Sequence, residues 1–163
     1  MPLATAALAA ALTEIIVTAR RLPEPIDQVP ISVTAFDGSA IERLQATSLD
    51  ELARFTPGFS FNSAAGRGPN SNRPVVRGLT TIRNGIANST VAATFVDGVY
   101  LGGSVQSTPL YDLERVEILR GPQSAQFGRA TYAGAVNYVT RNPGAEFAGG
   151  LELTGATHET WRV

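Results

Sequence analysis

The chain contains no cysteine and no lysine, and it has a single histidine, His158. Without cysteine it can form neither a disulfide framework nor a thiolate metal site. One histidine close to the C-terminus argues against a histidine-based catalytic or metal cluster. The absence of lysine excludes the phosphate-binding loop G-x-x-x-x-G-K-[ST], which requires that residue. The nucleophile-elbow motif G-x-S-x-G is also missing, so we expect neither enzyme activity nor a cofactor.

Charge is sparse and nearly balanced. The 163 residues include 13 arginines against 14 acidic residues, giving a formal net charge of −1, and 44% of the chain is hydrophobic. This balance excludes a nucleic-acid-binding arm and a disordered acidic tail. The length of the chain is sufficient for one domain with a hydrophobic core. A set of cations made only of arginine suits bidentate pairing with carboxylates, although genomic composition bias is an alternative explanation.

The N-terminal residues 1–13, MPLATAALAAALT, form an alanine- and leucine-rich run that is too short to span a bilayer. Ala9–Ala11 resembles the A-x-A end of a secretory signal, although the positively charged start of such a signal is missing. We interpret this run as the remnant of a signal peptide. A plain N-terminal helix is the alternative.

The next part of the chain combines extended and helical patterns. Residues 31–36, ISVTAF, alternate with a period of two and predict a strand. Ser39-x-x-Glu42 and Ser48-x-x-Glu51 both match the capping box, so each predicts a helix start. Thr56-Pro57-Gly58 should end the second helix. The apolar faces of the two helices should be supplied by Ile41, Leu44, Leu49, Leu52 and Phe55.

Polar loops separate the remaining strands. Residues 60–74 and 80–90, and a third segment at 102–108, are rich in small and polar residues. Val75–Arg77 predicts a brief strand, and Asp97-Gly98 between two apolar runs is a strong hairpin signal. Strands and short helices therefore interleave without regular βαβ spacing, which predicts an α+β fold with a small mixed β-sheet and long loops.

Residues 112–143, DLERVEILRGPQSAQFGRATYAGAVNYVTRNP, place one apolar strand before Arg120-Gly121-Pro122 and another after a short polar turn. A strand that ends at a glycine turn often marks phosphate binding. Here, however, Pro122 interrupts the segment, and no closely spaced glycines open a long helix. The segment instead resembles the signature that closes the plug domain of TonB-dependent outer-membrane receptors.

Other motifs of that family occur in the same order, and the resemblance covers about residues 14–145. Glu14–Arg20 resembles a TonB box, and Val29–Phe36 resembles the first plug strand. LDELARFTPGF resembles the plug helix and its exit. RPVVRGL and VDGVYL resemble two further motifs of the family.

The resemblance implies a domain organisation. Residues 14–20 would be the TonB box, 21–28 a linker, 29–145 the plug domain, and 146–163 the first strand of a transmembrane β-barrel. Because a barrel must close on itself, the residues after Pro143 cannot complete one. We therefore interpret the chain as a fragment or a truncated product, and a plug that works with a separately encoded barrel is the alternative.

The resemblance also assigns candidate site residues. The TonB box would consist of Glu14, Ile15, Ile16, Val17, Thr18, Ala19 and Arg20. Arg77 and Arg120, from the two R-G motifs, would lock the plug to barrel glutamates; the alternative is that they cap local turns or pair within the plug. The candidate ligand-facing residues are Arg67, Asn70, Asn72, Arg83, Asn84, Asn88 and Tyr100, for which solvated loop positions are the alternative.

The implied function is gating of energised nutrient uptake across the outer membrane. A siderophore-iron complex is the commonest substrate in the family, and cobalamin, other metal complexes and carbohydrates are alternatives. The partners would be TonB, which would add the box to its sheet as a strand, and the barrel that surrounds the plug. A freestanding periplasmic binding module without a pore is the competing interpretation.

Overall fold

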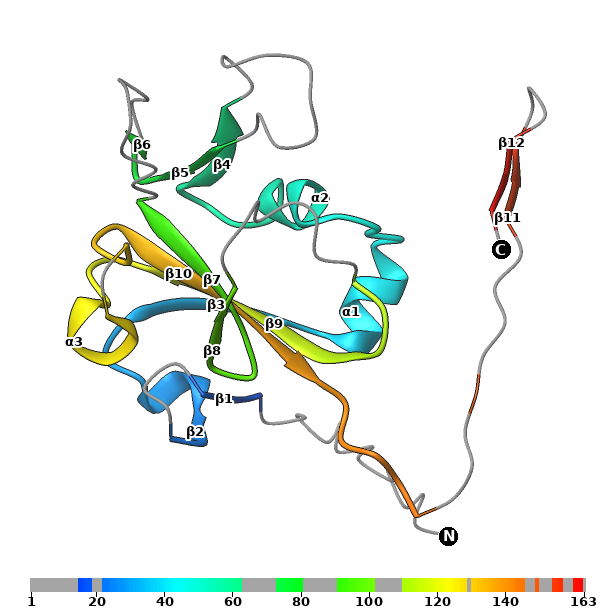
Figure 1. Ribbon diagram of the computed structural model, residues 1–163, viewed down its shortest axis with the longest axis horizontal. Coiled ribbons are helices and arrows are strands. Elements are labelled where there is room, and N and C mark those ends of the chain that lie inside the picture. Colours follow the sequence, from blue (N-terminus) through cyan, green and yellow to red (C-terminus); the bar gives the residue numbers. More distant parts are fainter. Residues whose placement is uncertain are drawn as a thin grey trace, which may run out of the picture.

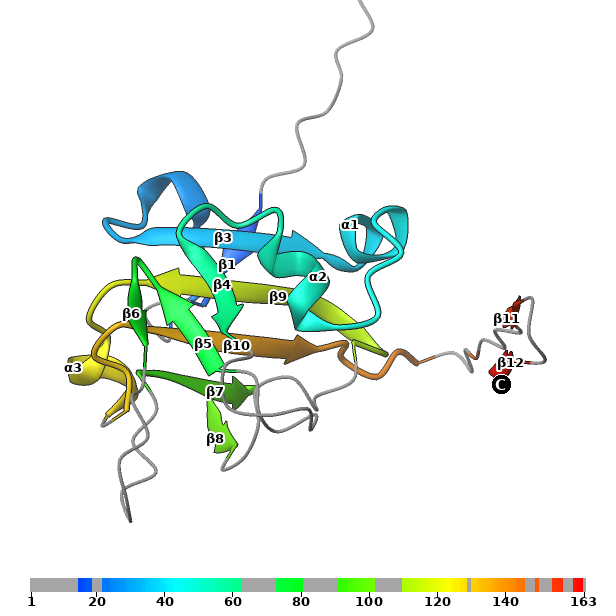
Figure 2. The same cartoon turned by 90° about the horizontal axis from the view of Figure 1, so that it is seen from above.

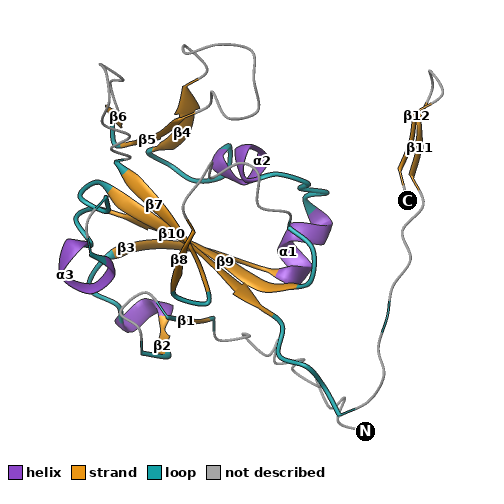
Figure 3. Cartoon of the chain, viewed as in Figure 1, coloured by secondary structure: helices purple, strands orange, loops and turns teal. Residues whose placement is uncertain are grey.

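The computed structural model of the chain describes residues 15–18, 22–62, 73–80, 91–101, 110–128, 130–145 and 149, and the backbone of residues 154–156 and 160–162. Strands predominate and the helices are short (Figure 1, Figure 3). The helices are α1 (Gly38–Arg43), α2 (Leu49–Ala53), α3 (Ser124–Phe127) and the 3₁₀ helix η1 (Ile26–Gln28). The strands are β1 (Ile16–Val17), β2 (Glu24–Pro25), β3 (Ser32–Asp37), β4 (Phe59–Asn62), β5 (Arg73–Val76), β6 (Leu79–Thr80), β7 (Ala92–Val96), β8 (Val99–Leu101), β9 (Leu113–Arg120), β10 (Gly134–Thr140), β11 (Thr154–Ala156) and β12 (Thr160–Arg162).

Five strands form the central sheet in the order β3-β9-β10-β7-β8 (Figure 2). Neighbouring strands are antiparallel except β10 and β7, which run parallel. The strands predicted on either side of Arg120-Gly121-Pro122 are β9 and β10, and they pair with each other. The turn predicted between them contains the short helix α3. The predicted α+β class with a small mixed sheet is confirmed.

Each face of the central sheet carries its own apolar cluster, so β7, β9 and β10 have buried residues on both faces. Successive side chains of a strand point to opposite faces. Accordingly, Val116 and Ile118 of β9 belong to one apolar cluster, whereas Leu119 belongs to another. The helices α1 and α2 lie on the first face, and β1, β2 and α3 lie on the second (Figure 1).

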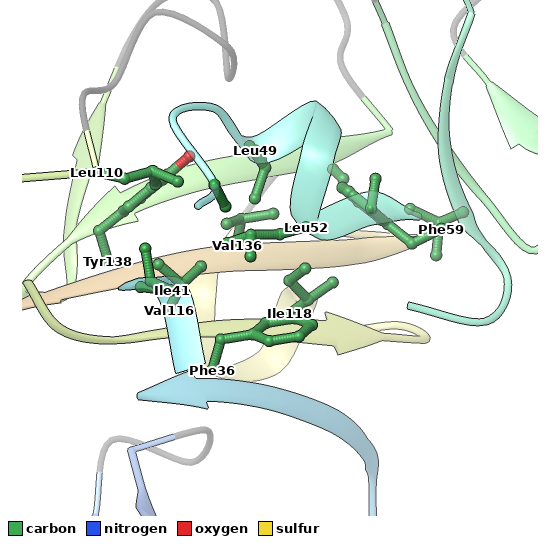
Figure 4. Close-up of a cluster of buried hydrophobic side chains, with 14 of the residues drawn as sticks. Phe36, Ile41, Leu49, Leu52, Phe59, Leu110, Val116, Ile118, Val136 and Tyr138 are labelled. Atoms are coloured by element: carbon green, nitrogen blue, oxygen red, sulfur yellow. The ribbon is translucent and has the colours of Figure 1, made fainter. Parts of the chain in front are cut away.

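The first face carries the larger core. Leu49 and Leu52 of α2 are fully buried and point toward Val136 of β10 (Figure 4). The capping box predicted at Ser48 and Glu51 is confirmed. Phe55 was predicted to join this face, but its side chain is 54% exposed because it follows the C-cap and lies in the turn after the helix.

The start of α1 differs from the prediction. The N-cap is Asp37, whose carboxylate accepts the backbone amide of Ala40 at 2.6 Å, and not a capping box built on Ser39. Ser39 lies inside the first turn, and its hydroxyl donates to Asp37 at 2.9 Å. The cap falls at Asp37 because β3 ends there in extended backbone, with φ −73° and ψ 166°, directly before the helical residues.

Two tight hairpins shape the rest of the domain. The predicted turn at Asp97-Gly98 joins β7 to β8, with φ values of 49° and 77°. A type I′ turn needs this left-handed pair. Arg77-Gly78 joins β5 to β6 in the same way, with φ values of 50° and 81°. Strands β4, β5 and β6 form a separate antiparallel sheet. Residues 60–62 and 73–74 were predicted to belong to a loop, but they lie in β4 and β5.

The two ends of the described chain also differ from their predictions. Glu24–Pro25, expected in an extended linker, pairs with Ile16–Val17 as a short antiparallel ladder. Near the C-terminus, where one strand was expected over 146–163, β11 and β12 pair antiparallel, with Gly155 opposite Trp161.

Candidate functional site

The segment predicted to be the TonB box lies against the second face of the central sheet. Of its seven residues, Glu14, Ala19 and Arg20 fall outside the described part of the chain. Val17 is fully buried in the apolar cluster of that face, whereas the side chain of Ile16 is 37% exposed. The carbonyl of Ile15 accepts the backbone amide of Ile26 at 3.0 Å. The box is therefore folded onto the domain as a short strand.

Thr18 ties this strand to the middle of β9. Its backbone amide donates to Oε1 of Glu117 at 2.7 Å, and its hydroxyl lies 3.1 Å from the same oxygen. Glu117 has no exposed surface, and Nε of Arg115 donates to its Oε1 at 2.8 Å. Bonds to a carboxylate are stronger than bonds between neutral groups. A single buried carboxylate thus holds both donors of Thr18.

The surroundings of Glu117 complete a polar cluster. Arg115 is buried, pairs with the half-exposed Glu114 as well, and has a terminal nitrogen 3.5 Å from the Thr18 hydroxyl. Asn137, opposite Glu117 in the register of β10, donates to the Thr18 hydroxyl at 3.3 Å and accepts the amide of Gly98 at 3.3 Å. We call Thr18, Arg115, Glu117 and Asn137 the Thr18 cluster.

Sequence reasoning did not single out Arg115, Glu117 or Asn137. The usable signal was the acidic residue in the apolar run VEIL. A strand buried on both faces can keep a charge only if that charge is paired and hydrogen-bonded. The sequence therefore indicated that Glu117 needs partners, but it did not show which ones.

The two R-G arginines meet at the turn that follows α2. Arg120 donates to the carbonyl of Pro57 and, at 2.9 Å, to the hydroxyl of Thr34. The side chain of Arg77 runs past Gly58 to Gly121, since a Cβ atom added at these glycines would lie 3.7 Å and 3.8 Å from it, respectively. The backbone amide of Arg77 also donates to the carbonyl of Gly58 at 2.7 Å. Two segments far apart in the chain thus place their guanidinium groups at one spot.

Among the residues that the structure describes, this spot carries positive charge without an acidic partner. Burial and then the charge of Arg77 lower the pKa of Arg120. Nε of Arg120 is buried and has no hydrogen-bond partner among the described residues. Within the same part of the chain, neither guanidinium is paired with a carboxylate. The bonds from Arg120 to Pro57 and Thr34 match the alternative interpretation of internal capping. They do not neutralise the charge of either arginine, and no carboxylate in the described part of the chain does so.

Most of the predicted ligand-facing residues cannot be placed. Arg67, Asn70, Asn72, Arg83, Asn84 and Asn88 lie outside the described residues. Tyr100 is on β8, opposite Phe95. The residue is 55% exposed, and the centroids of its ring and of the Phe95 ring are 5.9 Å apart. Its role in ligand binding stays a prediction.

Two further observations concern the described residues only. They contain no group of three metal-binding acidic or histidine side chains. None of their helices is both long enough and apolar enough to cross a bilayer.

Comparison with known proteins identifies relatives of this fold. The profile of the TonB-dependent Receptor Plug Domain matches residues 25–135. The vitamin B12 transporter BtuB of Vibrio vulnificus is 33% identical over 131 residues, which cover 77% of this chain and 20% of the relative. The probable TonB-dependent receptor BfrD of Bordetella pertussis is 29% identical over 138 residues, covering 85% of this chain and 17% of the relative. This chain therefore spans about a fifth of the length of these relatives.

Solved structures agree. The ferric yersiniabactin uptake receptor FyuA of Yersinia pestis superposes with a TM-score of 0.60 at 27% identity, covering 69% of this chain and 17% of that protein. The ferripyoverdine receptor of Pseudomonas aeruginosa shares the fold, with a TM-score of 0.65 at 18% identity, covering 82% of this chain and 17% of that one. Receptors of this kind are outer-membrane proteins. The chain belongs to the family of TonB-dependent receptor plug domains.

Proposed function

We propose that this chain is the plug of a TonB-dependent outer-membrane transporter, and that it gates energised uptake of a siderophore-iron complex or a similar scarce nutrient. The relatives support a nutrient of this kind, since they include a vitamin B12 transporter and a ferric yersiniabactin uptake receptor. The N-terminal box would engage TonB by strand addition.

One observation carries the assignment as a plug. Arg77 and Arg120 converge from separate motifs, and the described chain supplies no carboxylate for them. The exposed Arg77 beside the partly buried Arg120 is a favourable arrangement when acidic groups approach from outside. Glutamates on the inner wall of a surrounding barrel are acceptors of that kind.

The test uses the complete receptor. Cells that express it should accumulate a radiolabelled ferric hydroxamate, ferric catecholate or cobalamin, and accumulation should disappear when TonB is deleted. The same cells should still bind that ligand without TonB. Accumulation that does not depend on TonB would contradict the proposal. A complete protein that lacks a barrel would favour the freestanding binding module instead.

A further inference from the structure

We propose that Asp97 is a positioning residue that fixes the end of β10, and that this fixed end is the point at which the plug is joined to the segment that follows it. The anchoring of β10 rests on the contacts between Asp97 and Thr140. Its part in nutrient uptake rests on the proposed function.

The side chain of Asp97 continues a ladder that the backbone leaves at this residue. Strand β7 pairs in parallel with β10 as far as Val96, which lies opposite Tyr138. Asp97 still donates its amide to the carbonyl of Tyr138 at 2.8 Å, and its own carbonyl would accept the amide of Thr140 if the parallel ladder went on. The chain turns into the hairpin instead, and Oδ1 of Asp97 accepts that amide at 2.9 Å. Oδ2 accepts the hydroxyl of Thr140 at 2.8 Å.

The ladder on the other side of β10 is irregular at the same place. The register between β9 and β10 shifts between Val139 and Thr140, whose partners are Arg115 and then Leu113. Such a bulge disrupts the ladder locally. Thr140 thus lies where β7 has turned away and where pairing with β9 is disturbed. The carboxylate of Asp97 therefore supplies the acceptor that the regular ladder lacks.

The next residue is held from a second turn. Arg141 donates its amide to the carbonyl of Asp112 at 3.1 Å. Its guanidinium reaches the start of α1, since a Cβ atom added at Gly38 would lie 3.6 Å from Nη2. Asp97 and Asp112 have φ values of 49° and 54°, in the left-handed region that aspartate enters more readily than most residues. Two turns that are distant in the chain thus fix two consecutive residues, Thr140 and Arg141, which we call the exit residues.

Beyond the exit residues the chain leaves the sheet (Figure 1). Residues 142–145 are exposed and belong to no helix or strand. The ends of elements open more easily than their centres. If the plug is pulled from its N-terminus, the pull is resisted where the plug is joined to the next part of the transporter. Opening of β10 at this end would lengthen the connection, and less of the pull would then act on the rest of the domain.

The two aspartates offer a matched pair of variants. Asp97→Gly removes both acceptors of Thr140, and glycine tolerates the left-handed backbone. Asp112→Gly removes a carboxylate from the same backbone conformation but keeps the carbonyl that holds Arg141. Asp97→Asn is the conservative variant, because asparagine also tolerates this conformation and its side-chain oxygen can accept the amide of Thr140.

Hydrogen exchange of the Arg141 amide, followed by NMR in the 163-residue chain, reports the anchoring, because Asp97→Gly leaves the acceptor of this amide in place. We expect Asp97→Gly to accelerate the exchange at least about fivefold, the effect of one net hydrogen bond. Asp112→Gly and Asp97→Asn should stay within about twofold of wild type. The amide of Gly121, at the opposite end of β9, is the internal reference for opening of the whole domain and should not change.

Equal exchange of the Arg141 amide in Asp97→Gly and Asp112→Gly would overturn the anchor. Equal acceleration of the Arg141 and Gly121 amides in Asp97→Gly would also overturn it, because the effect would then be a general loss of stability. If Asp97→Gly does not fold, Thr140→Val decides the question, since it removes the hydroxyl bond to Asp97 and keeps the backbone. Acceleration of the Arg141 amide by at least about threefold in Thr140→Val supports the anchor, and an unchanged rate contradicts it.

Uptake by the complete receptor separates the anchor from the proposed function. The Asp97→Gly receptor should bind the radiolabelled nutrient like wild type and lose most of its TonB-dependent accumulation, whereas the Asp112→Gly receptor should retain both. Normal accumulation by the Asp97→Gly receptor, with faster exchange in the chain, would contradict the role of the anchor in uptake. A wild-type receptor whose accumulation does not depend on TonB would contradict the proposed function and leave the exchange result standing.

Discussion

Arg120 and Arg77 lie close enough for their charges to interact. Burial is the larger cause that lowers the pKa of Arg120, and the charge of Arg77 is the second. Arg77 lies in the turn between β5 and β6, and Arg120 is the last residue of β9. Both lie beside Pro57 and Gly58. Only Arg120 has side-chain bonds to the domain in the described structure, to Pro57 and Thr34. The two arginines should therefore respond differently to removal, and the difference depends on whether a barrel is present.

Arg120→Ala should destabilise this chain by about 1–2 kcal/mol, because two hydrogen bonds are lost. Arg77→Ala should change its stability by less than about 0.5 kcal/mol, since the residue is exposed. Urea unfolding of the chain measures both.

In the complete receptor we expect Arg77→Ala to lower the free energy of unfolding by roughly 3–5 kcal/mol if it leaves a buried glutamate unpaired. An Arg77→Ala receptor as stable as wild type would contradict the lock.

Gly134→Ala tests the close approach of β10 to β9. A methyl group at residue 134 would collide with the backbone carbonyl of Leu119, which cannot move aside without breaking the ladder. We expect a loss of about 1–3 kcal/mol in the free energy of unfolding. Gly144→Ala is the control, because Gly144 is exposed and its φ is not positive. Similar losses of unfolding free energy in the two variants would show that the collision with the Leu119 carbonyl is not what destabilises Gly134→Ala.

Asp37 gives a prediction about pH. The amide of Ala40 and then the hydroxyl of Ser39 lower the pKa of Asp37 below its ordinary value of 3.8. A group with a lowered pKa in the folded state contributes stability above its unfolded pKa, and the contribution disappears as the pH falls through the folded value. Asp37→Ala should thus cost about 1 kcal/mol near neutral pH, as for loss of an N-cap.

The stabilities of Asp37→Ala and of the wild type should converge as the pH is lowered below the ordinary pKa of an aspartate. Thermal unfolding across the acid range measures this convergence. Asp50→Ala is the control, because Asp50 lies in the first turn of α2, where Ser48 is the cap. A difference between Asp37→Ala and wild type that does not change with pH would show that the carboxylate is not the cap.

Much of the fold was predictable from local patterns. The Asp97-Gly98 turn, the capping box at Ser48 and the strands around Arg120 each follow from neighbouring residues, and the structure has them. The cap of α1 was not predictable in this way. Both Asp37 and Ser39 are good capping residues, and the choice depends on where β3 ends in extended backbone.

The Thr18 cluster could not be predicted because its contacts join distant parts of the chain. Thr18 and Glu117 are 99 residues apart, so no local spacing relates them. The prediction of a free linker at 21–28 differed from the structure for a related reason. A proline-rich segment is compatible with an extended tether and with an edge strand, and pairing of Glu24–Pro25 with the box selects the strand.

The proposal that the N-terminal box engages TonB by strand addition during energised uptake is tested most directly by Ile16→Pro in the complete receptor. Proline removes the backbone donor that strand addition needs and fixes φ, while the partly exposed side chain of Ile16 contributes little to the core. Ile16→Ala is the matched control, because it keeps the amide. Uptake of the radiolabelled nutrient and its binding to the cells are measured for both variants. We predict that Ile16→Pro abolishes uptake and retains binding, and that Ile16→Ala retains both. Normal uptake by the Ile16→Pro receptor would contradict the account, and residues 15–18 would then be a structural strand only.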